Sequence, residues 1–147
     1  MKPWTADAWN IEGTKSLPPI LRALSIIAPQ DGRVYLEEPQ DKAVRETLHP
    51  LSDPLPDVRI ATGTLRVREN ALFHIPSTPE NLQVLVELAE THASPEVCMH
   101  LVLYTRDRIL LEAYDVPAGG ITINKSVARQ HVQEFCNASG GKLVNTA

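Results

Sequence analysis

The stretch from residue 98 to residue 114 constrains the fold of this chain more than any other. Two runs rich in β-branched, aromatic and long aliphatic residues lie on either side of the polar pair Arg106-Asp107. This spacing predicts a β-hairpin whose strands are 98–104 and 108–114. The predicted cross-strand pairs are Tyr104–Ile109, Leu103–Leu110, Val102–Leu111, Leu101–Glu112, His100–Ala113 and Met99–Tyr114.

Both faces of this predicted hairpin are mostly apolar. Because a hairpin with one solvated face alternates apolar with polar residues, we expect this one to be covered on both sides. The cover comes either from the chain's own helices or from another protein. Glu112 is the acidic exception, and it is either an acid near an exposed strand edge or a functional carboxylate.

Three longer helices are predicted by apolar stripes together with terminal signals. Their caps and stops are Ser16 and Pro29, Thr78 and the segment 93–95, and Ser126 and Gly140-Gly141. The buried stripe of the last helix is predicted to be Ala128, Val132, Phe135, Cys136 and Ser139. Between these helices we expect a strand at 33–37, a short helix at 41–48, a proline-rich loop at 49–57, a hairpin over 58–75 with its turn at Glu69-Asn70, and a strand at 121–124.

This order of elements predicts an α+β fold, a mostly antiparallel sheet built from hairpins with about four helices packed against it. A length of 147 residues predicts one domain, 1–147. Residues 1–16 form an N-terminal arm that contains both tryptophans, Trp4 and Trp9, with 9–12 as a short edge strand. The arm either docks on its own domain or anchors a partner protein through its indoles.

Composition and charge narrow the class of protein. The chain is 43% hydrophobic and 22% charged, which is ordinary for a soluble globular protein. It has no apolar run of roughly 20 residues and no apolar core in its first ten residues, so we expect no membrane span and no secretory signal. Cys98 and Cys136 both fall at predicted core positions, so we expect them to be reduced and the protein to be cytoplasmic.

The acidic charge is concentrated in one stretch, from residue 37 to residue 57. The net charge of −4 argues against a nucleic-acid partner, which needs a concentrated positive field. We name this stretch the acidic belt; its acids are Glu37, Glu38, Asp41, Glu46, Asp53 and Asp57. Such a belt is either a solvated face or a surface that docks a basic partner.

No catalytic, phosphate-binding or metal-binding motif is found, so the sequence predicts no catalytic residue, no metal ligand and no cofactor. The strongest pattern of this kind is Cys98 with His100, two residues apart on one predicted strand, although nothing in the sequence activates the thiol.

Two functions are therefore expected. The first is a small cytosolic binding or regulatory domain that acts through protein–protein contact. Its candidate residues are Glu38, Asp41, Glu46, Trp4 and Trp9. The alternative is a small-ligand-binding protein or enzyme whose site lies over the 98–114 hairpin, at His100, Glu112 and Tyr114. A homodimer through one hairpin face is compatible with either.

Overall fold

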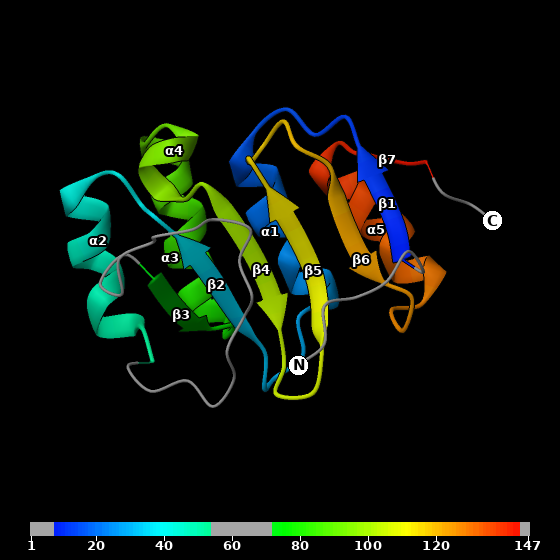
Figure 1. Cartoon of the computed structure of the whole chain (residues 1–147), viewed down its shortest axis with the longest axis horizontal. Helices are drawn as coiled ribbons and strands as arrows, with labels where there is room; N and C mark the ends of the chain where they lie inside the picture. Colours follow the sequence, from blue (N-terminus) through cyan, green and yellow to red (C-terminus); the bar gives the residue numbers. More distant parts are fainter. Residues whose placement is uncertain (1–7, 54–71, 145–147) are drawn as a thin grey trace.

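The fold is an antiparallel sheet with helices packed on it, as a computed structural model of the chain shows (Figure 1). The structure describes residues 8–53 and 72–144. Within them, seven strands form one sheet in the order β3-β2-β4-β5-β6-β1-β7, and every pairing between them is antiparallel. Their bounds are β1 Ala8–Glu12, β2 Arg33–Glu37, β3 Leu72–Pro76, β4 His100–Tyr104, β5 Ile109–Tyr114, β6 Ile121–Asn124 and β7 Lys142–Leu143.

Three long helices lie on one face of this sheet, which we call the helix-covered face (Figure 1). The described helices are α1 Leu17–Ile27, α2 Lys42–Leu48, α3 Pro79–Thr91, α4 Ser94–Val97 and α5 Arg129–Ser139, with a 3-10 turn at His49–Leu51. Helix α1 packs between α3 and α5, and α2 adds its two buried residues, Val44 and Leu48, to the same core. The predicted α+β class, with four helices of at least seven residues on an antiparallel sheet, is confirmed.

The core on the helix-covered face is apolar throughout. Alternate strand residues point toward the helices because side chains along a strand change face with a period of two. These strand residues are Ile11, Val34, Leu36, Phe73, Ile75, Leu101, Leu103, Leu111, Ala113, Ile121 and Ile123. The predicted stripe of the last helix meets them with Val132, Phe135 and Cys136, all buried.

The register of the central hairpin differs from the prediction by one residue over most of its length. Tyr104 does face Ile109, but a β-bulge follows, and Leu103 then pairs with Leu111 instead of Leu110. The extra residue, Leu110, packs toward the helices, so two consecutive residues of β5 face the same core. As a result His100 lies opposite Tyr114, and Glu112 lies opposite Val102. A bulge leaves no mark in an apolar run, which is why the periodicity missed it.

Several helix ends were predicted correctly and others were not. Thr78 caps α3 by accepting a hydrogen bond from the Asn81 backbone N–H, and Gly140 ends α5 in the left-handed conformation at φ 82°. The cap of α5 is Ala128, not the predicted Ser126, because Ser126 lies in the turn after β6, where its N–H bonds to Asn124. The short helix α4 and the strand β7 were not predicted.

Two sequence predictions fall outside the described residues. The turn at Glu69-Asn70 lies there with most of the proposed 58–75 hairpin, of which only β3 is described. Trp4 lies there too. Over the described residues, no helix combines the length and apolarity needed to cross a membrane.

Candidate functional site

The face of the sheet turned away from α1, α3 and α5, which we call the opposite face, holds the candidate site. In its end row, Leu72, Glu37, His100 and Tyr114 are cross-strand neighbours on β3, β2, β4 and β5. Glu112 precedes Tyr114 by two residues on β5 and therefore shares this face. We call Glu37, His100, Glu112 and Tyr114 the Glu37 cluster.

Glu37 is the most unusual member of this cluster. The residue is 0% exposed, and within the described structure neither of its carboxylate oxygens has a hydrogen-bond partner. No described cation forms an ion pair with it either. Buried acids are normally paired or hydrogen-bonded, because removing a carboxylate from water without compensation is costly. The burial of this carboxylate is therefore not explained by a contribution to stability.

His100 and Tyr114 stand beside Glu37 with their rings in contact. The ring centroids are 5.1 Å apart in an edge-on arrangement. The His100 Nδ1 accepts a hydrogen bond from the backbone N–H of Asp115 at 3.0 Å. When the imidazole is neutral, its proton is then on Nε2, and that nitrogen is a donor. The cluster thus contains a fixed histidine tautomer next to a buried acid.

The Tyr114 hydroxyl is held in its neutral, donating form. Burial, followed by the charge of Glu112 and a hydrogen bond to its side chain, raises the pKa of Tyr114 to about 12, with a further contribution from the charge of Glu37. The charges of both carboxylates therefore act on the Tyr114 phenol, and its hydroxyl donates a hydrogen bond to the Glu112 side chain. This agrees with the strand register, which puts Glu37, Glu112 and Tyr114 on one face of the sheet.

The backbone is strained next to two members of this row. Glu38 and Asp115, the residues that immediately follow Glu37 and Tyr114, adopt positive φ angles of 53° and 51°. Non-glycine residues rarely take this conformation, which costs about 1–2 kcal/mol per residue. Strain of this kind collects at functional sites, where the surroundings enforce it. Among the described residues, Glu38 and Asp115 are the non-glycine residues with positive φ, and both lie next to the cluster.

The remainder of the opposite face is an apolar patch with a half-buried histidine at its side. Tyr35, Val102, Tyr104 and Ile109 are all buried there. His74 Nδ1 lies 2.7 Å from the Tyr104 hydroxyl. Burial lowers the pKa of His74 from its usual 6.5, opposed by the charge of Asp53 and assisted by that of Arg33.

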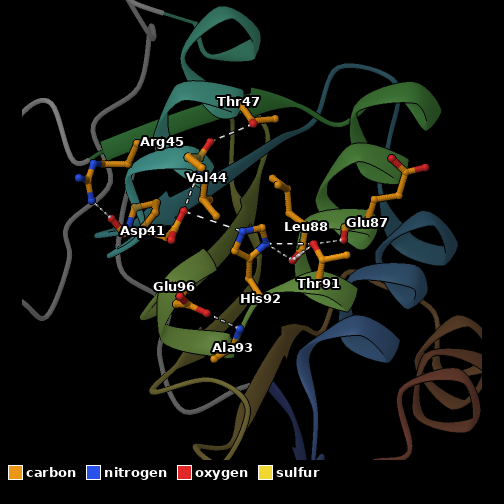
Figure 2. A network of polar contacts seen from close by, with 12 residues as sticks. Asp41, Val44, Arg45, Thr47, Glu87, Leu88, Thr91, His92, Ala93 and Glu96 are labelled. Carbon is orange, nitrogen blue, oxygen red and sulfur yellow. Dashed lines mark hydrogen bonds and ion pairs between the residues drawn. The ribbon is translucent and has the colours of Figure 1, made fainter.

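The members of the acidic belt do not share one environment. Asp41 caps α2 by accepting a hydrogen bond from the Val44 backbone N–H at 3.0 Å, and its other neighbour is His92, whose Nε2 is 3.9 Å away at the end of α3 (Figure 2). Asp53 pairs with Arg33 at 3.0 Å. These two acids therefore hold elements of the fold together.

Other predicted binding residues are found at separate places. Glu46 is exposed on α2, 66% at its side chain, and forms a loose pair with Lys42 at 3.7 Å. Glu38 is half-buried in the strained turn after β2. Trp9 is half-buried on the helix-covered face, where its indole N–H donates to the Val127 carbonyl at 3.0 Å and Lys125 Nζ lies 3.6 Å from its ring. Trp9 therefore docks on its own chain.

The proposed pairing of Cys98 with His100 does not make a reactive thiol. Cys98 is fully buried at the C-terminal cap of α4, and burial raises the pKa of its thiol to about 12. A thiolate is the nucleophilic form, and this environment suppresses it. Both cysteines are free. In the described part of the chain, no three histidine, cysteine or acidic side chains are grouped so that they could hold a metal ion.

His100, Glu112 and Tyr114, the predicted residues of the alternative ligand site, lie together in the structure. The sequence analysis did not assign Glu37, the fourth member of the cluster, to this site. Glu37 was assigned to the acidic belt because it begins a run of acids. Its position two residues after Tyr35 in strand 33–37 was the available signal, since it places the carboxylate on the same face as a buried ring.

Comparison with protein-family models, with curated proteins and with solved structures found no match for this chain.

Proposed function

We propose that this chain binds a small molecule at the Glu37 cluster on the opposite face. The observation that carries the proposal is the Glu37 carboxylate, fully buried and without a partner among the described residues. A polar group of this kind is retained when a ligand supplies the missing contact. Ligand-binding or enzymatic activity are both compatible with this site.

The arrangement of the cluster suits a binding site. Glu37 is fully buried, whereas His100, Glu112 and Tyr114 are each partly exposed. The buried acid thus has three neighbouring side chains that solvent partly reaches. Convergent polar groups on rigid strands beside apolar residues are the usual composition of a small-molecule site.

The test is a fragment screen followed by protein-observed NMR. We expect hits to shift the backbone amides of the four cluster residues and to lose their effect in a His100→Ala variant. Glu46→Gln is the matched control, because it alters an exposed carboxylate on α2. A screen whose hits scatter over the surface, or that yields none, would count against a site here.

A second candidate is protein–protein contact through the exposed acids of α2. It is favoured by the exposure of Glu46, whose ion pair with Lys42 in the described structure is a weak surface contact. A basic partner, or a second copy of the chain, would then dock beside α2. Charge reversal by Glu46→Lys should abolish that binding and leave the melting temperature nearly unchanged, whereas binding at the Glu37 cluster should not respond.

A further inference from the structure

The charge of Glu37 has no compensation in the described structure. Arg33 shares this face of β2 four residues before Glu37, and it is paired with Asp53 at 3.0 Å. The cluster contains a second acid, Glu112, whose charge acts on Tyr114 together with that of Glu37. The cluster therefore contains two carboxylates, and none of its four members is a lysine or an arginine.

The other side chains of the cluster also suit a positive ligand. The Tyr114 and His100 rings contact each other edge-on, so the cluster contains aromatic rings as well as carboxylates. Cations are attracted to aromatic faces as well as to carboxylates, and the attraction grows when the site is shielded from water. A buried carboxylate next to an aromatic ring is a combination that recognises ammonium groups.

We infer that the ligand of the Glu37 cluster is a small organic cation, an amine or a guanidinium compound, whose charged group pairs with the Glu37 carboxylate. This inference rests on the proposed binding site and adds the chemical class of its ligand. A neutral or anionic ligand would leave the buried carboxylate unpaired or would oppose it, and either arrangement lowers affinity.

The experiment compares three probes of one shape and different charge: benzylamine, benzyl alcohol and benzoate. Each is titrated into the isotope-labelled full chain, and the amide shifts of Glu37, His100, Glu112 and Tyr114 are followed. We expect benzylamine to bind at least about tenfold more tightly than benzyl alcohol, because one partly buried ion pair readily contributes that much affinity. Benzoate should have no effect, because its charge has the same sign as that of Glu37.

Two variants assign the effect to the buried acid. Glu37→Gln keeps the size of the side chain and removes its charge, so benzylamine affinity should fall about tenfold or more while that of benzyl alcohol is retained. Glu112→Gln provides a second reading if Glu37→Gln disturbs the fold, and it should weaken benzylamine by a smaller factor. Glu46→Gln should leave all three titrations unchanged.

The failure of the inference and the failure of the site give different results. If benzyl alcohol or benzoate shifts the cluster as strongly as benzylamine, the site stands and the cationic class is wrong. If benzylamine has no effect while a neutral fragment from the broader screen binds there, the cationic class is equally wrong. If no fragment of any charge reaches the cluster, the proposed function itself fails.

Discussion

The two faces of the sheet are built by the same strands and differ in what they bury. The helix-covered face buries only apolar side chains from its strands, and three helices close it (Figure 1). The opposite face buries an apolar patch at Tyr35, Val102, Tyr104 and Ile109, but it also buries the Glu37 carboxylate at one end. One face is therefore optimised for stability, and the other holds a charge that works against it.

The difference between the two faces separates the buried residues that apolar packing explains from those that it does not. Apolar burial is non-directional, and it explains every strand residue on the helix-covered face. It cannot explain a carboxylate at 0% exposure without a partner among the described residues, nor two strained residues beside it. The buried Glu37 carboxylate and the two strained residues lie together at the Glu37 cluster.

The largest expected effect is on the helix-covered face. Leu103 is fully buried there, so Leu103→Ala should lower the free energy of unfolding by about 2–5 kcal/mol, the usual cost of a lost transfer energy plus a cavity. Urea denaturation measures it. A loss below about 1 kcal/mol would mean that this core is loosely packed and that the contrast between the faces is weaker than described.

The second effect should have the opposite sign. Glu37→Met replaces the unpartnered carboxylate by an apolar side chain of similar length, so the free energy of unfolding without ligand should rise by about 1–3 kcal/mol. Glu46→Met, at an exposed acid, is the matched control and should stay within about 0.5 kcal/mol. If Glu37→Met destabilises the protein, then the carboxylate is stabilising in place and the functional interpretation of its burial loses its basis.

A smaller gain is expected from relieving the strained turn next to Glu37. Because Glu38 has a φ of 53°, Glu38→Gly should raise the free energy of unfolding by up to about 1 kcal/mol. This is the cost of the left-handed conformation for a non-glycine residue, minus the larger conformational entropy that glycine loses on folding. Glu38→Ala removes the same side chain and keeps the strain, so it isolates the backbone contribution. Equal stability of the two variants would show that the φ angle carries no cost.

The smallest effect is a pH dependence confined to the opposite face. Burial lowers the pKa of His74 in the folded state below the value of 6.5 in the unfolded chain. As the pH falls, the imidazole is therefore protonated in the unfolded state before it is protonated in the folded state. The contribution of His74 to stability is therefore present above about pH 6.5 and is lost as the pH falls through the lowered folded value. His74→Gln should flatten this acid-side decline in melts recorded across pH. A decline of the same slope in both proteins would assign it to other groups.

Local signals determined much of this protein from sequence alone. Apolar stripes and terminal signals such as Thr78 and Gly140 placed the helices, because capping and amphipathicity depend on residues within one or two turns. The alternation of apolar and turn residues placed the strands and, with the helices, the α+β class. It also assigned His100, Glu112 and Tyr114 to one hairpin, but the predicted register put His100 on the other face from Glu112 and Tyr114.

Only the tertiary structure decided the rest, because it depends on contacts between distant parts of the chain. The bulge after Tyr104 moved His100 opposite Tyr114, and the pairing of β2 with β4 put Glu37 beside His100, 63 positions away in the sequence. The sequence analysis assigned Glu37 to the acidic belt together with the other acids between residues 37 and 57. Its environment depends on which strands flank it, and strand order is set by the packing of the whole sheet rather than by any local pattern.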